Sequence, residues 1–202
     1  MANLNVAILG PPGYAKEVAK KGTSTDITFY NLKRGESTVT IVEPTRYPER
    51  LAPLFFAASM ARRAVLVVDQ IDATFGEIVI MLQALGIKDG YIILRNYLDP
   101  GRVNPVIKGT VLEGYEQIID DPNALRERLL DEADRLKEAQ PSPEERGGAI
   151  PVDHFFNVRG IGTVILGTMA EGVIRKHETL RVLPGERTAQ VRSIQKHDDD
   201  FD

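Results

Sequence analysis

The apolar run at residues 64–68, which ends at Asp69, constrains the fold of this 202-residue chain more than any other feature. Consecutive apolar residues without polar alternation are typical of a strand that is buried on both faces. Such strands occur in parallel sheets that helices cover on both sides. The run therefore predicts an α/β domain with a mostly parallel sheet.

Strand-like and helix-like patterns alternate around this run, as a parallel sheet with crossover helices requires. We expect strands at residues 4–9, 26–32, 37–42, 64–68, 91–94 and 106–108. We expect helices at residues 14–21, 48–62, 74–85 and 123–137. Together these segments predict a sheet of about six strands with flanking helices.

The texture of the chain changes after residue 138. Residues 139–149 are rich in Pro, Gly and Glu, which indicates a linker. Short strand-like runs follow at residues 155–158, 163–167, 179–183 and 190–194, as in antiparallel barrels. We therefore expect an α/β domain at residues 1–138 and the first part of a β-barrel at residues 150–202.

Composition excludes several classes of protein. With 25 basic and 29 acidic residues the net charge is −4, which argues against non-specific DNA binding. No apolar run approaches the roughly 20 residues that span a bilayer, and no signal-peptide pattern is present. The absence of cysteine rules out disulfides, and His154, His177 and His197 are too scattered to suggest a metal cluster. We expect a cytoplasmic protein that binds neither membrane nor metal.

A glycine-rich turn follows the first strand-like run, where phosphate-binding loops occur. Such loops follow the pattern G-x-x-x-x-G-K-S/T, in which backbone N–H groups and the Lys hold phosphates and the hydroxyl holds magnesium. Residues 10–17 read G-P-P-G-Y-A-K-E. Gly10 and Lys16 match the pattern and Gly13 lies between them, but an alanine replaces the second glycine and Glu17 replaces the hydroxyl residue. The segment is either a degenerate phosphate loop or a structural turn.

A longer resemblance lies in the second half of the chain. Residues 152–167 read V-D-H-F-F-N-V-R-G-I-G-T-V-I-L-G, and this run resembles the start of domain II in the SelB and elongation factor Tu family of translational GTPases. The resemblance continues through residues 172–175, 183–185 and 191–195. It implies that the first 138 residues form a G domain, with residues 104–110 as its last strand. The chain most resembles the archaeal SelB-like proteins with degenerate GTPase motifs.

The resemblance also shows where the G domain departs from the family. The family motif D-x-P-G-H, whose Gly contacts the γ-phosphate and whose His positions the attacking water, corresponds to residues 43–47, E-P-T-R-Y. Glu43 is the nearest equivalent of the magnesium-side Asp. The region that carries a magnesium-sensing Thr is almost absent, because residues 22–26 follow Lys16 so closely. Phosphoryl transfer needs these parts together, so the resemblance implies a pseudo-GTPase that does not hydrolyse GTP.

The guanine-binding motif N-K-x-D corresponds to residues 96–99, N-Y-L-D, in which the Lys is lost. Asn96 and Asp99 are either a relic guanine site or an Asx-turn pair that closes a loop. We expect the following helix to be missing between Asp99 and Asn104. The supporting S-A-L motif then corresponds to residues 110–112. On this view the nucleotide site keeps Gly10, Gly13, Lys16, Asn96 and Asp99 in degenerate form, and neither GTP nor magnesium is expected to bind.

Domain II supplies the second candidate site. In the family the aminoacylated 3′ end of tRNA lies between the G domain and domain II, and an Asp-His pair lines the SelB pocket. Asp153 and His154 match this pair, although a turn cap and a packed barrel residue are equally good readings. Arg159, Arg175 and Arg192 are candidate phosphate contacts, and each also fits a solvated strand face.

The resemblance implies a binding factor for tRNA or the ribosome. A GTP-binding elongation factor with an atypical site and a protein-interaction scaffold remain alternatives. Fewer residues follow Ile150 than a family barrel needs, and a half-barrel exposes unpaired edges. We therefore expect the rest of domain II and domain III to come from a longer protein or from another chain.

Overall fold

The computed structural model describes residues 3–138, 147–169, 171–196 and 199–201. The chain divides into two compact units, unit 1 (Met1–Gln140) and unit 2 (Pro141–Asp202). Within the residues described, none of the helices is both long and apolar enough to cross a membrane.

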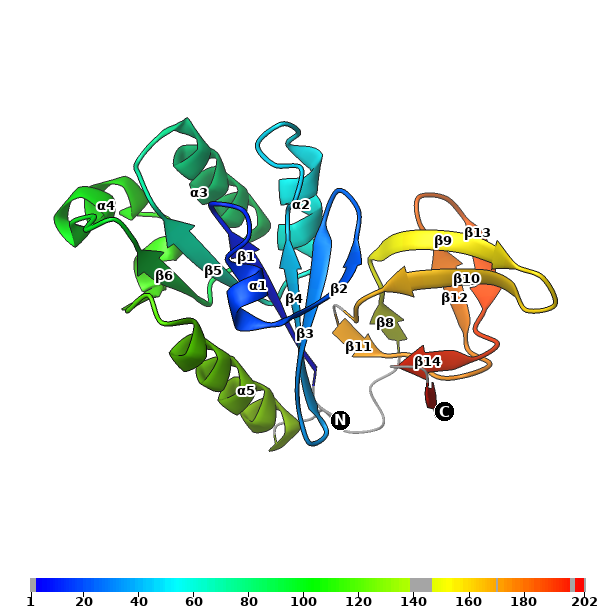
Figure 1. The fold of residues 1–202 in the computed structure, drawn as a ribbon. Coiled ribbons are helices and arrows are strands. Elements are labelled where there is room, and N and C mark those ends of the chain that lie inside the picture. The colour runs from blue at the N-terminus through cyan, green and yellow to red at the C-terminus, as the bar shows by residue number, and fades with distance from the viewer. Residues whose placement is uncertain (1–2, 139–146, 170, 197–198, 202) are drawn as a thin grey trace. The chain divides into compact units, whose positions relative to one another are not determined.

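Unit 1 is built on a seven-stranded sheet with the strand order β2-β3-β4-β1-β5-β6-β7 (Figure 1). Its strands are β1 (Asn3–Leu9), β2 (Lys20–Ser24), β3 (Thr28–Arg34), β4 (Ser37–Glu43), β5 (Arg63–Val68), β6 (Gly90–Leu94) and β7 (Glu116–Ile118). The strands from β4 to β7 pair in parallel, whereas β2, β3 and β4 form an antiparallel meander. The expected α/β fold with a mostly parallel sheet is confirmed.

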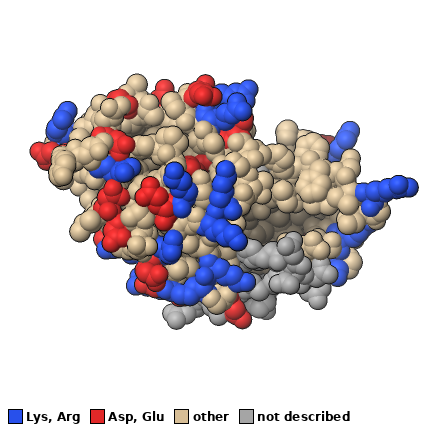
Figure 2. All heavy atoms as spheres, viewed as in Figure 1, with Lys and Arg blue, Asp and Glu red and all other residues tan. Residues whose placement is uncertain are grey.

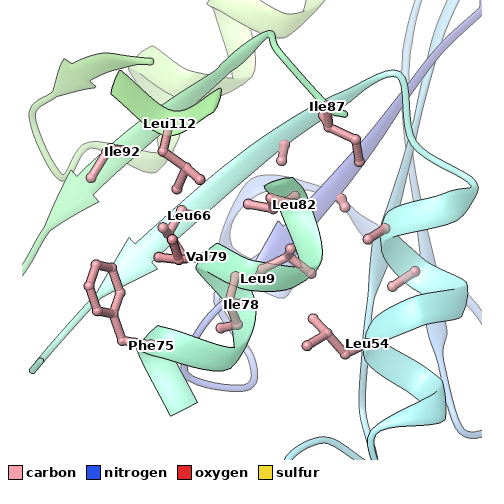
Figure 3. Packing of buried hydrophobic residues seen from close by; sticks show 14 of the residues in the cluster. Leu9, Leu54, Leu66, Phe75, Ile78, Val79, Leu82, Ile87, Ile92 and Leu112 are labelled. Atoms are coloured by element: carbon pink, nitrogen blue, oxygen red, sulfur yellow. The ribbon is translucent and has the colours of Figure 1, made fainter. Parts of the chain in front are cut away.

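Helices cover both faces of this sheet. They are α1 (Ala15–Val18), α2 (Ala52–Ser59), α3 (Ala73–Leu85), α4 (Pro100–Ile107) and α5 (Pro122–Glu138), with the 3₁₀ turn η1 at Val111–Gly114. One core lies under α2 and α3, where Leu54 and Leu82 pack with Leu66 of β5 (Figure 3). The other core lies under α5, where Leu125 packs with Val65, the neighbour of Leu66. Adjacent residues of β5 thus point into the cores on opposite faces of the sheet. Because both faces of the strand are buried, its apolar run is unbroken.

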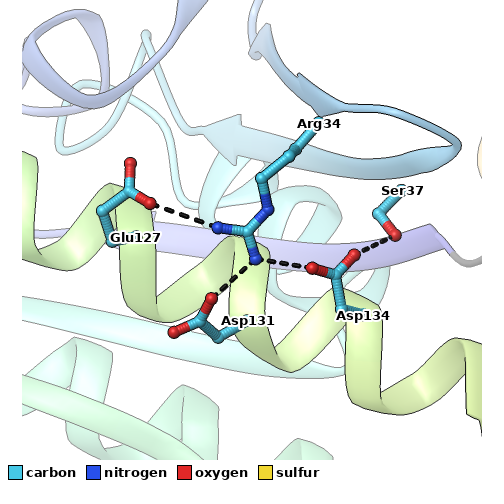
Figure 4. A network of polar contacts seen from close by, with 5 residues as sticks. All are labelled: Arg34, Ser37, Glu127, Asp131 and Asp134. Atoms are coloured by element: carbon cyan, nitrogen blue, oxygen red, sulfur yellow. Dashed lines mark hydrogen bonds and ion pairs between the residues drawn. The ribbon is translucent and has the colours of Figure 1, made fainter.

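A polar network holds the β3–β4 hairpin against α5 (Figure 4). The Arg34 guanidinium lies 3.2 Å from a carboxylate oxygen of Glu127, 2.6 Å from Asp131 and 2.5 Å from Asp134. The Ser37 hydroxyl donates to the other oxygen of Asp134. The three acidic residues follow one another at helical spacing, so a single side chain from the hairpin reaches all of them.

The structure corrects the expected start of the domain. The helix expected at residues 14–21 is a single turn, α1, and the chain then enters β2. β2 adds a seventh strand at the sheet edge, paired with β3 from Lys20↔Asn31 to Ser24↔Thr28. Its five residues are all exposed, so it lacks the apolar pattern by which a strand is recognised in a sequence.

Two expectations for the next part of the chain are wrong, namely a last strand at residues 106–108 and the absence of a helix after Asp99. Residues 104–107 lie in α4, which begins directly after Asp99 and fills the gap where no helix was expected. The last strand is β7, which pairs with β6. Pro105 inside α4 favoured a non-helical reading, because proline removes an N–H donor from a helix interior. Pro105 nevertheless lies inside α4, whose first residue, Pro100, is at a position where the missing N–H is not needed.

Unit 2 consists of short antiparallel strand pairs within its described residues: β9 (Val152–Val158) with β10 (Gly162–Gly167), β11 (Glu171–Val173) with β8 (Gly147–Ala149), β12 (Thr179–Val182) with β13 (Arg187–Gln190), and β14 (Ile194–Lys196) with β15 (Asp199–Phe201). β8 begins inside the segment expected to be a linker, whose residues 139–146 lie outside the description. The strand expected at residues 190–194 lies earlier, at β13.

Candidate functional site

The glycine-rich loop after β1 contains the first group of candidate residues. Gly10 has a φ of 127°, and a Cβ at this position would lie 2.1 Å from the carbonyl oxygen of Val67 in β5. Gly13 has a φ of 94°. Both backbone conformations suit only glycine, so these two residues determine how the loop turns into α1. Packing against β5 therefore explains why residue 10 is a glycine, without any reference to a ligand.

The N–H groups of this loop are bonded to a side chain of the protein itself. Glu43, the last residue of β4, is 5% exposed, and its Oε1 atom accepts hydrogen bonds from the Gly13 N–H at 2.8 Å and the Ala15 N–H at 3.3 Å. The Tyr30 hydroxyl donates to the Oε2 atom at 3.0 Å. Burial of Tyr30 and the adjacent carboxylate of Glu43 raise the pKa of the Tyr30 phenol to about 12. A carboxylate therefore lies in the loop whose pattern resembles a phosphate cradle.

Lys16 and Glu17, the next two candidate positions, are exposed on α1. A Cβ built on Gly13 would lie 3.7 Å from the Lys16 ammonium nitrogen, so the Lys16 side chain lies close to the turn. Glu17 is the residue that the expected motif aligns with the family's hydroxyl residue. No group of three or more His, Cys, Asp or Glu side chains in the described part of the chain is placed to hold a metal ion.

Residues 43–47, the expected equivalent of the family's D-x-P-G-H motif, begin at the end of β4 and continue into the segment that follows it. The Thr45 and Thr28 hydroxyls lie 2.5 Å apart, and the Arg50 guanidinium lies 3.0 Å from a carboxylate oxygen of Asp26. Tyr47, which the sequence resemblance aligns with the water-orienting His, is 4% exposed. The Tyr47 hydroxyl lies 3.0 Å from both the carbonyl oxygen of Thr74 and a carboxylate oxygen of Glu77 in α3.

The motif at residues 96–99 forms a turn into α4. Asn96 and Tyr97 both have a positive φ, 54° and 56°. The Asp99 carboxylate accepts a hydrogen bond from the Gly101 N–H at 2.8 Å and caps α4. This is the Asx-turn role that the sequence allowed as an alternative. The S-A-L equivalent was placed at residues 110–112 because the last strand was expected just before them. The last strand is β7, so that placement is also wrong, and the segment after the last strand is 119–121.

A polar cluster at the carboxyl edge of the sheet was not anticipated. The Tyr14 hydroxyl donates to Asp120 at 2.8 Å, and Arg95 Nε donates to the other oxygen of Asp120 at 3.0 Å. Arg95 also lies 3.8 Å from Asp69 and over the Tyr14 ring, 5.8 Å from its centroid. Arg95 directly follows β6 and Asp69 directly follows β5, so their positions after apolar runs were the signal available in the sequence. Ligands of α/β sheets bind at this edge.

In unit 2 the Asp-His pair lies in β9. His154 is exposed and is paired in register with Leu166 of β10. The backbone of Asp153 belongs to the same strand, and its side chain lies outside the description. Beside His154, the hairpin exposes a cross-strand pair on its other face: Phe155, 74% exposed, is in register with Ile165, 46% exposed.

The three candidate arginines of unit 2 do not share one environment. Arg159 is exposed just beyond β9. Arg175 is exposed, and its backbone N–H donates a hydrogen bond to Glu178 Oε2 at 2.9 Å. Arg192 Nη1 donates to the carbonyl oxygen of Ile161 at 2.7 Å, and this hydrogen bond uses one of the five N–H donors of the guanidinium.

Comparison with known proteins identifies relatives among archaeal proteins and translation factors. The chain is 40% identical over 203 aligned residues to an uncharacterised protein of Methanocaldococcus jannaschii, covering 100% of this chain and 64% of that protein. It is 25% identical over 198 residues to the selenocysteine-specific elongation factor of the same organism, covering 89% of this chain and 42% of that factor. No family model matches the chain.

Solved structures agree with these sequence relatives. Elongation factor SelB of Methanococcus maripaludis, bound to a GTP analogue, superposes with a TM-score of 0.74 and 21% identity, covering 99% of this chain and 48% of SelB. A bacterial selenocysteine-specific elongation factor superposes with a TM-score of 0.71 and 20% identity, covering 100% of this chain and 40% of that protein. The resemblance to the SelB and elongation factor Tu type of protein is confirmed, and the chain spans about half the length of the elongation factors that it matches.

Proposed function

Because the chain is related in sequence and in fold to the SelB-type elongation factors, we propose that it is a SelB-like factor that binds tRNA or the translation machinery and does not hydrolyse GTP. The proposal has two parts, the loss of the reaction and the retention of the partner. Each part is supported by different residues.

The position of Tyr47 is the observation that carries the first part. In the family a His at this position orients the water that attacks the γ-phosphate. Tyr47 is buried, and its hydroxyl is bonded to the Thr74 carbonyl and to Glu77, inside the contact with α3. A side chain held in this way offers no group to a water above the phosphate loop, and hydrolysis depends on such a positioned water.

The residues present do not fit magnesium and GTP. Glu43 lies against the loop N–H groups that a phosphate would need, and Glu17 replaces the hydroxyl ligand. The buried carboxylate of Glu43 opposes phosphate binding, because like charges repel strongly where water is scarce, and the exposed Glu17 adds a weaker repulsion that water screens. These contacts support a factor that does not carry out magnesium-dependent phosphoryl transfer.

The second part of the proposal places tRNA on unit 2. His154 is exposed on β9, and Phe156, 45% exposed on the same face of the hairpin, offers an aromatic ring for a terminal base. Arg159 and Arg175 are exposed on the same unit and can meet phosphates. Lys and Arg side chains also gather over the face of unit 1 drawn in Figure 2. The overall net charge of −4 makes a local, specific contact a better match than non-specific binding.

A scaffold without RNA remains the second candidate, because the β9–β10 hairpin exposes apolar side chains on both faces. Those residues are Phe155 and Ile165 on one face and Phe156 and Leu166 on the other. Exposed apolar surface of this kind also marks contacts between proteins.

The experiment that tests the proposal compares two tRNA substrates. The double variant Asp153→Ala/His154→Ala is expected to weaken binding of tRNA with an intact 3′ end at least tenfold, and to change binding of 3′-trimmed tRNA by less than about threefold. Glu186→Ala, an exposed acidic residue of the same unit, is the matched control and should change neither. Equal losses for both substrates would make the pair structural, and no binding of either tRNA by the unmodified protein would favour the scaffold.

A further inference from the structure

The contact between Glu43 and the glycine-rich loop joins two parts of the chain that are 30 residues apart. Gly13 and Ala15 both direct their N–H groups at one oxygen of the carboxylate, and Tyr30 supplies a third donor to the other oxygen. Converging backbone N–H groups in a turn with positive φ form a concave site for anions. In this chain an anion already fills that site, and it is a side chain.

A side-chain anion has an advantage over a free one. Glu43 is attached to the end of β4, beside β1, so it reaches the loop without the loss of translational freedom that a free ligand suffers. A phosphate that enters the loop must therefore displace a group that is always present at high effective concentration. It must also approach the negative charge of the displaced carboxylate.

We propose that Glu43 is a built-in substitute for phosphate, and that the loop at residues 10–16 is an oxyanion site kept occupied from within the chain. The inference deepens the proposed function and rests on it for the identification of this loop as the former nucleotide site. It assigns a ligand class to the loop once Glu43 is removed, namely tetrahedral oxyanions such as inorganic phosphate and pyrophosphate.

Two neighbours of the carboxylate are consistent with this assignment. Lys16 lies close to Gly13 and is exposed, so a cation remains beside the emptied loop. Tyr30 is 5% exposed, and its hydroxyl donates to the carboxylate oxygen that does not accept from the loop N–H groups. Gly10 and Gly13 supply the positive φ values of the loop, a backbone conformation that glycine adopts without strain.

The test measures pyrophosphate and inorganic phosphate binding by calorimetry in the absence of nucleotide. Glu43→Ala is expected to bind pyrophosphate at least tenfold more tightly than the unmodified chain. Glu49→Ala is the matched control, since it removes the same charge from an exposed residue of unit 1 that lies outside the loop. A gain confined to Glu43→Ala supports the proposal. An equal gain in both variants would show a change of net charge only, and no gain in a folded Glu43→Ala would contradict the proposal.

A second measurement needs no variant. In the unmodified chain without any ligand, the amide protons of Gly13 and Ala15 should exchange with solvent at least tenfold more slowly than that of Gly35, which lies in an exposed turn. Exchange of Gly13 and Ala15 at the rate of Gly35 would overturn the inference even if Glu43→Ala did not fold. Failure of either test leaves tRNA binding unaffected, so it is distinguishable from failure of the proposed function.

Discussion

The Oε1 atom of Glu43 lies 2.8 Å from the amide nitrogen of Gly13, within the loop that resembles a phosphate cradle. The same segment that provides Glu43 continues to Tyr47, whose hydroxyl is bonded to Thr74 and Glu77 of α3. Two residues of one segment, four positions apart, thus underlie the occupied loop and the proposed loss of the reaction. The SelB-like fold remains intact around them.

Replacing Tyr47 by His is expected not to create GTPase activity. The substitution restores the family's side chain, but Glu43 still fills the loop and Glu17 still replaces the hydroxyl ligand. GTP turnover by Tyr47→His, measured as phosphate release, should stay at the background of a reaction without protein. Turnover that is magnesium-dependent and absent from the unmodified chain would show that Tyr47 alone separates this protein from an active GTPase.

Gly10→Ala is expected to destabilise unit 1 by at least ~2 kcal/mol, because its φ is positive and its Cβ would collide with the Val67 carbonyl. Gly76→Ala is the matched control in α3, where a Cβ would meet nothing within 4 Å. That change should stabilise the helix by ~0.5–1 kcal/mol. Urea unfolding measures both, and a Gly10→Ala variant as stable as the unmodified chain would refute the close packing of the loop on β5.

Asp99→Ala is expected to cost ~1 kcal/mol of stability through the lost cap of α4, whereas Asp99→Asn should cost little, since Asn is an equally good cap. Neither change should alter the shift in melting temperature that is measured on addition of GTP. If Asp99→Asn left stability unchanged but abolished a GTP-dependent shift in melting temperature, Asp99 would be a guanine ligand.

Stability should fall steeply at alkaline pH. The pKa of the Tyr30 and Tyr91 phenols is raised from 10.0 to about 12, by burial first and then by contacts with Glu43 and Glu132 respectively. A raised folded-state pKa gives stability that is complete below pH 10 and is lost as the pH rises through about 12. Urea midpoints measured from pH 9 to 12 test this, and Tyr30→Phe should flatten the decline. A midpoint that is constant across this range would contradict it.

Much of unit 1 could be predicted from the sequence, because its strands carry strong signals. The apolar runs of β1, β4, β5 and β6 and the Gly86 stop of α3 all lie close to their expected positions. β2 could not be predicted, because an edge strand that is exposed throughout has no apolar period. α4 was missed because Pro105 and its shortness hide a helical pattern, and the error displaced the last strand from β7.

For the glycine-rich loop, the sequence indicated which residues lie at the site but not which of them contact one another. The sequence indicated that Glu43 stood near the magnesium side of the loop, and the structure shows that its carboxylate lies in the loop itself. That contact depends on the parallel pairing of β4 with β1, which brings together residues distant in sequence. The cluster of Tyr14, Arg95 and Asp120 depends on the same sheet order and carries no motif.

Binding of tRNA with an intact 3′ end, measured with and without magnesium and GTP, tests the central claim most directly. Nucleotide can change tRNA affinity only if it binds and interacts differently with the free and tRNA-bound states. With the loop occupied by Glu43, the account predicts a measurable Kd that changes by less than about twofold on addition of millimolar GTP and magnesium. A tenfold or larger tightening by GTP, equal to ~1.4 kcal/mol of coupling, would contradict it.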